Sequence, residues 1–165
     1  MKLLRIVIWI GFLLCVVAMQ LQVAKLMHAS NYGIVAFEFA KQTHIENILT
    51  QWNTGNVLPI AKSNMAIDFV FIVFYVALVI MLSYRQMQRE KWYVLNSLLR
   101  LNFLLIVLAG ILDIIEDVFL LKNIHAFSTT HEYTSTYWVA LIKFVIAGWA
   151  VFVWLISLIK STVSK

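Results

Sequence analysis

The sequence has a single cysteine, a single proline and only five glycines among its 165 residues. One cysteine, Cys15, cannot form an intramolecular disulfide, and its isolation excludes a CxxC redox or zinc motif. So little proline and glycine argues against a collagen-like chain, a linker-rich chain and an all-β chain. The sequence also contains no glycine-rich phosphate loop and no HExxH zinc motif.

Charge is scarce as well. Charged residues make up 13% of the chain and hydrophobic residues 62%, against about 25% and about 45–50% in typical soluble domains. A soluble domain of this length could not bury so much apolar surface, so the composition predicts a single integral membrane domain over residues 1–165. The net charge of +5 does not indicate nucleic-acid binding, because the basic residues lie at the ends of apolar segments, as in membrane proteins.

Four apolar stretches reach the ~17–25 residues that a spanning helix needs. They predict an all-α, four-transmembrane-helix bundle with spans at about 3–23, 64–84, 98–121 and 137–159. Lys2 and Arg5 precede the first stretch, as in a signal peptide, but the apolar run is long and no small-residue cleavage site follows, so we expect an uncleaved span. The second span is expected to begin after Ser63 and Asn64, which are good helix-capping residues.

The connection over residues 24–63 is the longest and is predicted to be helical. Apolar residues recur in it at steps of three to four, which indicates amphipathic helix: Ile34, Phe37, Ile45, Ile48 and Trp52. The one wider gap in this series coincides with Thr-His-Ile-Glu at 43–46, a capping box. We therefore expect two short amphipathic helices, at about 32–42 and 44–53, on the membrane surface over the outer mouth of the bundle.

The distribution of basic residues predicts that both termini are cytoplasmic. With the N-terminus inside, eight Lys and Arg residues lie on the inner side: Lys2, Arg5, Arg85, Arg89, Lys91, Arg100, Lys160 and Lys165. Four lie on the outer side: Lys25, Lys41, Lys62 and Lys122. Cytoplasmic loops of membrane proteins are enriched in Lys and Arg, so this orientation is the expected one.

Three acids stand inside the third span. Asp113, Glu116 and Asp117 are spaced i, i+3, i+4 and therefore share one helix face. Counting ~1.5 Å per residue from Arg100 places them ~20–26 Å across a ~30 Å hydrocarbon core. This position lies in the outer half of the membrane.

The other spans place polar groups at a similar depth. Asp68 and Tyr75 share a face of the second span, and Gln20 falls in the outer part of the first. Lys143 lies in the fourth span on a stripe of small residues that permits close helix packing: Ala140, Ala147 and Ala150. Ionisable residues inside a membrane cost ~2.5–3.5 kcal/mol each on insertion scales, so their convergence calls for an explanation.

Three interpretations of this constellation remain open. The acids and Lys143 form buried ion pairs that fix helix register, or they line a functional pocket, or Asp117 and Asp68 reach headgroup water. About three carboxylates share one intramembrane cation, so the excess must be neutralised by protons, a bound cation or water. In the pocket interpretation, ligand-binding residues are Asp68, Tyr75, Asp113, Glu116, Asp117 and Lys143, and the four acids are also the catalytic candidates. His125 and His131 are weak candidates for a metal site, since their spacing does not indicate zinc.

Three segments carry a resemblance to a known family. They are Phe37-Glu38-Phe39-Ala40 with the capping box and Trp52, then 68–75 (Asp-Phe-Val-Phe-Ile-Val-Phe-Tyr), and 110–117 (Gly-Ile-Leu-Asp-Ile-Ile-Glu-Asp). The chain up to about Leu121 resembles a family of small bacterial four-helix membrane proteins, which implies a bacterial inner-membrane location and brings no assigned activity. Asp117 stands where that family has asparagine, so the resemblance does not define its role. By analogy alone, the architecture is also similar to the four-helix sterol isomerase and sigma-2 receptor group, which places carboxylates in a membrane-embedded lipid pocket.

We expect a small multi-pass membrane protein whose acidic pocket in the outer half binds an amphiphilic or cationic ligand. The alternative is a lipid- or isoprenoid-modifying enzyme that uses paired carboxylates as acid and base. A second alternative is an ion or proton conduit, which would have to form an oligomer because Asn102 and Ser157 are the only polar steps in the inner halves of the spans. Membrane lipids are the expected partners, nucleic acid is not, and no cofactor is indicated.

Overall fold

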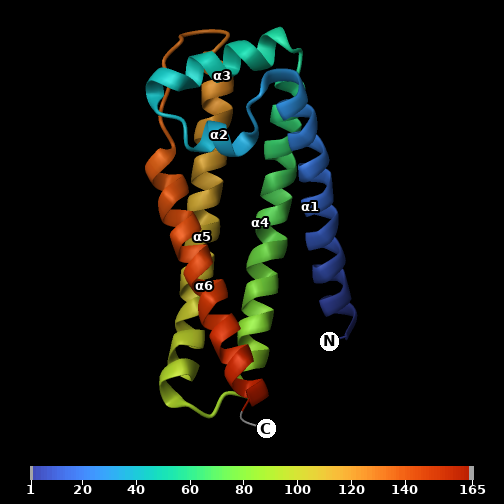
Figure 1. The fold of residues 1–165 in the computed structure, drawn as a ribbon, viewed down its shortest axis with the longest axis vertical. Coiled ribbons are helices and arrows are strands. Elements are labelled where there is room, and N and C mark those ends of the chain that lie inside the picture. Colours follow the sequence, from blue (N-terminus) through green and yellow to red (C-terminus); the bar gives the residue numbers. More distant parts are fainter. Residues whose placement is uncertain (1, 164–165) are drawn as a thin grey trace.

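In the computed structural model, which describes residues 2–163, the chain forms six helices. Four are long: α1 (Lys2–Ser30), α4 (Leu58–Met87), α5 (Tyr93–Ala126) and α6 (Tyr137–Val163). Two short helices, α2 (Ile34–Glu38) and α3 (Gln42–Thr54), lie between α1 and α4. The long helices run side by side in alternating directions, and both ends of the chain lie at the end of the bundle opposite α2 and α3 (Figure 1).

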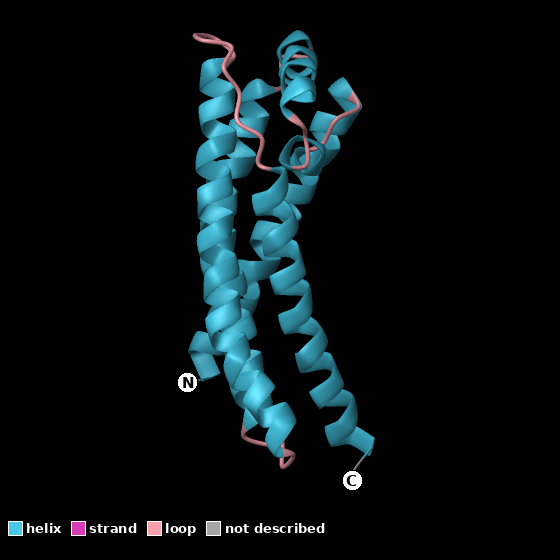
Figure 2. Cartoon of the chain, turned by 90° about the vertical axis from the view of Figure 1, so that its left-hand side faces the viewer, coloured by secondary structure: helices cyan, strands magenta, loops and turns pink. Residues whose placement is uncertain are grey.

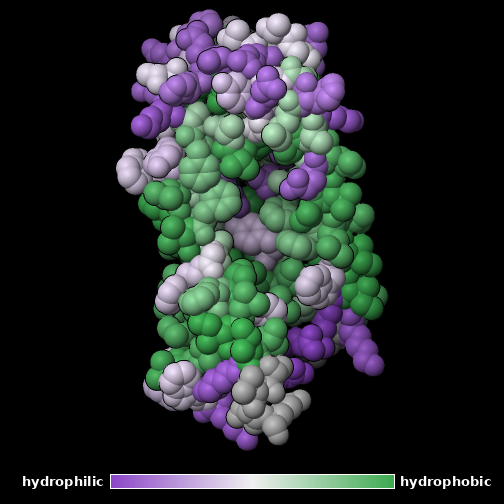
Figure 3. Space-filling model, viewed as in Figure 1, coloured by the Kyte–Doolittle hydropathy of each residue, from purple (hydrophilic) through white to green (hydrophobic). Residues whose placement is uncertain are grey.

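Three helices are long and apolar enough to cross a membrane: α1, α4 and the part of α6 over Tyr137–Ser161. The predicted third span, α5, is not among these candidates; it carries Arg100, Asp113, Glu116 and Asp117. Exposed apolar side chains cover the outer faces of all four long helices, and on the face seen in Figure 3 they form a band between two polar ends. This surface is compatible with a multi-pass membrane protein.

The long helices extend beyond the predicted spans, and the expectation that Ser63 and Asn64 cap the start of the second long helix is wrong. α4 begins at Leu58 with Pro59 in its first turn, where proline's fixed φ and missing N–H suit a helix start. Asn64 is not a cap: its Nδ2 atom donates to Met19 O at 3.2 Å and to Gln22 Oε1 at 3.0 Å, which ties α4 to α1. At the other junction, α1 ends at Ser30, and the next residue, Asn31, has a φ of 60°, the left-handed conformation that often follows the end of a helix.

The two short helices predicted for the first connection are present, with different boundaries. α2 is only five residues long, and α3 begins at Gln42. The predicted capping box is wrong, because Lys41 occupies the cap position without a side-chain hydrogen bond and Thr43 lies inside the helix. α3 is fixed instead by its buried face, which explains why the apolar period located the helix while the capping motif misplaced its start.

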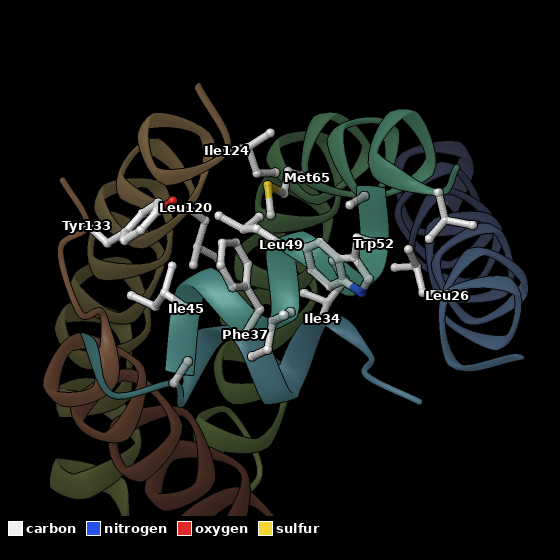
Figure 4. Packing of buried hydrophobic residues seen from close by; sticks show 14 of the residues in the cluster. Leu26, Ile34, Phe37, Ile45, Leu49, Trp52, Met65, Leu120, Ile124 and Tyr133 are labelled. Atoms are coloured by element: carbon white, nitrogen blue, oxygen red, sulfur yellow. The ribbon is translucent and has the colours of Figure 1, made fainter. Parts of the chain in front are cut away.

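Together α2 and α3 form a cap over one end of the bundle, which Figure 2 shows from the side. Phe37 and Trp52 are fully buried, with ring centroids 5.0 Å apart, and Trp52 Nε1 donates to Tyr32 O at 3.0 Å. These rings pack among side chains of α4 and α5 in a single apolar cluster that includes Met65 and Leu120 (Figure 4). The cap is therefore held on the bundle by a substantial hydrophobic core.

Adjacent long helices pack closely, with one exception. α4 packs on α1 and on α5, and α5 packs on α6. Gly110 permits the close approach of α5 to α4, since a Cβ atom there would lie 2.8 Å from Val76 Cγ2. Among the described helices, α1 and α6 share no extended contact, so the bundle is open along the seam between them.

Candidate functional site

Lys143 of α6 is buried at the centre of a group of acids. Its Nζ atom lies 2.5 Å from Asp113 Oδ1 and 2.6 Å from Glu116 Oε2, both on α5. A third carboxylate, Glu38 of α2, lies 3.9 Å from the same Nζ atom. The structure thus joins Lys143 to two of the acids that share a face of α5, and the cap adds an acid that was not among the predicted site residues.

Glu38 is held in this position by contacts between the cap and the residues at the start of α6. Thr136 Oγ1 donates to the backbone oxygen of Glu38 at 2.8 Å, and Ser135 Oγ donates to that of Ala40 at 2.9 Å. The Phe39 ring stacks on Phe144 at 5.7 Å. Burial raises the pKa of the Glu38 carboxyl; Lys143 opposes this shift and Asp113 adds to it.

α4 contributes Asp68 and Tyr75 on the same face, as their spacing predicts. Asp68 is 7% exposed, and it has neither a hydrogen bond nor an ion-pair partner among the described side chains. The phenol of Tyr75 interacts with the Asp113 carboxylate. The expected contribution of Gln20 is wrong, because this residue is exposed and Gln22, two positions later, is the α1 amide that bonds to α4.

The group formed by Lys143 and the five acids around it, here called the acidic cluster, contains far more carboxyl groups than cations. Its acids are Glu38, Asp68, Asp113, Glu116 and Asp117. Four of their oxygens are buried with no hydrogen-bond partner among the described residues: Glu38 Oε2, Glu116 Oε1, Glu116 Oε2 and Asp117 Oδ2. Of these, Glu116 Oε2 and Glu38 Oε2 lie 2.6 Å and 3.9 Å from the Lys143 ammonium. Buried carboxylates are costly unless paired, so the cluster requires protons or a further cation.

A cavity of about 530 Å³ lies beside the acidic cluster, within the range of ~300–1,000 Å³ usual for ligand sites. Four ionisable side chains line it toward the cap: Glu38, Asp68, Asp113 and Lys143. Farther from the cap its walls are apolar and come from all four long helices: Trp9 and Phe12 of α1, Phe71, Leu78, Val79 and Leu82 of α4, Ile106 of α5, and Val151 and Trp154 of α6. The cavity is thus polar at one end and apolar along the rest.

The cavity lies along the open seam between α1 and α6. Met19 of α1 and Ala147 of α6 line its two sides, at helices that have no extended contact with each other. In Figure 3 the surface is hollowed near the middle of this face, and polar groups are visible inside an apolar rim. A molecule dissolved in a surrounding bilayer would meet this opening from the side.

The histidines lie away from the acidic cluster. His125 is exposed, and the Nδ1 atom of His131 lies 3.1 Å from the Tyr133 hydroxyl and 3.6 Å from Glu46 Oε1. Among the described residues, no group of three or more His, Cys, Asp and Glu is arranged to hold a metal ion. The structure therefore does not bring the two weak metal candidates to the acids.

Polar groups in the other half of the bundle join helices to one another. Asn102 Nδ2 donates to Ala150 O at 2.8 Å, and Ser157 Oγ donates to Glu90 Oε2 at 3.0 Å. Gln86 Nε2 donates to Ser157 O at 2.8 Å. These side chains connect α4, α5 and α6 and do not continue the polar end of the cavity.

No family model, no curated protein and no solved structure matches this chain.

Two polar residues of this region were missed from sequence. Glu38 stands between two phenylalanines in a segment expected to lie on the membrane surface, so nothing in the local pattern indicated that it would reach Lys143. Its one signal is the Phe-Glu-Phe context, where a carboxylate is flanked by large apolar side chains. Gln22 was missed because α1 has apolar residues on all sides, which hides the face that contacts α4.

Proposed function

We propose that this protein crosses the membrane four times and binds an amphiphilic molecule taken from the bilayer. The polar head of the ligand would lie at the acidic cluster, and its apolar body would lie along the seam between α1 and α6. The observation that carries this proposal is the cavity, because it joins ionisable side chains at one end to apolar walls along the rest.

Chain connectivity supports four spans. α4 and α6 are both candidate spans and run in the same direction (Figure 1). A chain that crosses a membrane twice in one direction must cross back in between, and α5 is the helix that connects the two. Its acids are tolerable at that depth because Asp113 and Glu116 pair with Lys143 and all three acids are buried, as intramembrane ionisable residues usually face the bundle interior.

The basic residues support cytoplasmic termini. Most of the positive charge lies at the end that carries the termini and the α4–α5 connection, which is the cytoplasmic signature; Lys165, counted among these residues, lies outside the described residues. This orientation places the cap and the acidic cluster toward the outer side of the membrane, and the resemblance to small bacterial membrane proteins points to the inner membrane of a bacterium.

The binding proposal is tested by filling the cavity. Ala147 lines the cavity, whereas its neighbour Gly148 is exposed and a Cβ atom added there meets no atom within 4 Å. We would measure the melting temperature in nanodiscs against single-chain amphiphiles with cationic, neutral and anionic heads. A saturable rise in wild type and in Gly148→Trp, but not in Ala147→Trp, is expected because a ligand that binds the folded state stabilises it.

Two results would contradict binding. One is the absence of a rise with every amphiphile, and the other is an equal rise in both tryptophan variants, which would indicate general bilayer effects.

A second candidate, acid–base modification of a lipid, is favoured by one observation. Asp113 and Asp68 both line the cavity, but Asp113 is paired with Lys143 and Asp68 is not. Two carboxyls in different environments are the arrangement in which one acts as acid and the other as base. Deuterium uptake from D₂O into the bound amphiphile, lost in Asp68→Asn, would support this function; no uptake by wild type would exclude it.

The ion-conduit alternative is not favoured. Apolar side chains of α4 and α6, such as Leu82 and Val151, line the cavity away from the cluster, and the polar groups beyond them are bonded to neighbouring helices.

A further inference from the structure

The charge balance at the polar end of the cavity indicates which kind of head group it accepts. Lys143 is the one cation among the described cavity-lining residues, and it already lies within 4 Å of three carboxylates, Glu38 included. A phosphate or carboxylate head would therefore find this ammonium occupied and would add negative charge to a cluster that already has an excess of acids.

Two carboxylates that line the cavity accept no hydrogen bond from Lys143: Glu38, whose Oε2 atom lies 3.9 Å from the Nζ atom, and Asp68. Glu38 is 5% exposed and its Oε2 atom has no hydrogen-bond partner among the described residues. Asp68, 7% exposed, has no ion pair within the described part of the chain. Glu38 comes from the cap and Asp68 from α4, so the two approach the cavity from different elements. A buried carboxylate that accepts no hydrogen bond is costly, and a ligand cation that donates one would reduce that cost.

Aromatic rings line the part of the cavity that adjoins these carboxylates, and Phe71 follows Asp68 by three residues on α4. Phe12 of α1 and Phe71 of α4 have ring centroids 5.4 Å apart, and Phe71 lies 5.3 Å from Tyr75. All three rings line the cavity. The faces of such rings attract organic cations, and this attraction grows when the cation is removed from water. The surroundings therefore favour an ammonium over a hydroxyl group.

We propose that the ligand is a monocationic amphiphile, with a protonated amine or quaternary ammonium head between Glu38 and Asp68 and an apolar body along the α1–α6 seam. This inference rests on the proposed function and specifies the ligand class of the same cavity. Anionic lipids would be excluded by the acid excess, and neutral single-chain lipids would bind more weakly because they leave the carboxylates unpaired.

The test compares three probes of one chain length: dodecylamine, dodecanol and dodecanoic acid. Each is added to the full chain in zwitterionic phosphatidylcholine nanodiscs, at equal mole fractions in the bilayer fixed by partitioning into empty nanodiscs. The readouts are melting temperature and quenching of tryptophan fluorescence by brominated versions of the probes, since Trp9 and Trp154 line the cavity. Dodecylamine should bind most tightly, dodecanol more weakly, and dodecanoic acid not at all.

Variants then assign the charge recognition to the two carboxylates. Glu38→Gln and Asp68→Asn should each weaken dodecylamine binding about tenfold or more, as loss of a charge-assisted bond does, and leave dodecanol binding unchanged. Glu132→Gln, at an exposed acid on the α5–α6 connection, is the matched control and should bind as wild type does. The probe series on wild type decides the question even where a variant does not fold.

The outcomes separate the two proposals. If dodecanol or dodecanoic acid binds as tightly as dodecylamine, the cavity binds amphiphiles and the cationic inference is wrong. If dodecylamine binds best but neither carboxylate variant weakens its binding, the ligand is cationic but the placement of its head between Glu38 and Asp68 is wrong. If none of the three probes binds, both the inference and the proposed function fail.

Discussion

The carboxylates of the acidic cluster differ in whether they are paired with Lys143, and this difference determines what each contributes. Asp113 and Glu116 lie within 2.6 Å of the Lys143 ammonium, whereas Asp68 and Asp117 have no ion pair among the described residues. The paired acids therefore stabilise the packing of α5 on α6. The unpaired acids form no ion pair that would stabilise helix packing. Their burial is explained best by a bound ligand or by protons that neutralise their charge.

Removal of the Lys143 ammonium should destabilise the protein, because it leaves Asp113 and Glu116 buried without their cation. Lys143→Met is expected to lower the free energy of unfolding by about 3–5 kcal/mol, since breaking a buried ion pair leaves uncompensated charge. The loss should be larger at pH 8 than at pH 5, where protons neutralise the acids. Unfolding in nanodiscs measures it, with exposed Lys122→Met as the control. Equal stability of Lys143→Met and wild type at both pH values would contradict the pairing.

The burial of Glu38 should make the stability of the protein depend on pH. Burial raises the pKa of the Glu38 carboxyl above the usual value of a glutamate, so the folded state holds the proton more tightly than the unfolded state does. Stability contributed by the protonated form is then lost as the pH rises through the raised folded-state pKa. The melting temperature of Glu38→Gln minus that of wild type should therefore rise from pH 4 to pH 8. A difference that falls over this range, judged against Glu132→Gln, would show that the ionised carboxylate is well paired.

At the scale of elements, the sequence predicted the long helices well and the site in part. Apolar runs located all four long helices, and the i, i+3, i+4 spacing placed Asp113 and Glu116 on the face that meets Lys143. The helix starts were less predictable, because Asn64 has the chemistry of a cap and yet bonds across to α1. Glu38 could not be predicted, since its position depends on how α2 packs on the start of α6.

The cap should contribute strongly to stability through its buried aromatic pair. Trp52 is fully buried against Phe37, so Trp52→Ala should cost about 3–5 kcal/mol, the usual loss for a large aromatic in a core. His44→Ala, at an exposed position on the same helix, should change stability by less than about 0.5 kcal/mol. Trypsin should also cut the cap at Lys41 faster in Trp52→Ala than in wild type. Equal stability and equal cutting rates would contradict the close packing of the cap.

At the scale of the whole molecule, four helices of alternating direction place both ends of the chain together and the cap at the opposite end (Figure 1). The cavity opens between the first and last long helices rather than at either end. A ligand that enters there needs no passage through water, which agrees with an amphiphile taken from the bilayer. In the proposed orientation, with the basic end of the bundle cytoplasmic, the acidic cluster approaches the outer side of the membrane.

The orientation is tested with single cysteines in a background that lacks Cys15. Thr50→Cys on α3 and Thr130→Cys on the α5–α6 connection should react with a membrane-impermeant maleimide in intact cells. Gln88→Cys, on the α4–α5 connection, should react only after the membrane is opened. All three positions are exposed. Reaction of the Gln88→Cys site alone in intact cells would reverse the orientation and place the acidic cluster toward the cytoplasm.

An experimental structure in a lipid nanodisc tests the central claim most directly. The account predicts elongated density in the cavity between α1 and α6, with its polar end within hydrogen-bond distance of Glu38 or Asp68 and its tail beside Trp9 and Trp154. The same density should be missing in Ala147→Trp and present in Gly148→Trp. A structure in which α1 closes against α6, with the acids paired only among themselves and Lys143 and no room for a ligand, would contradict it.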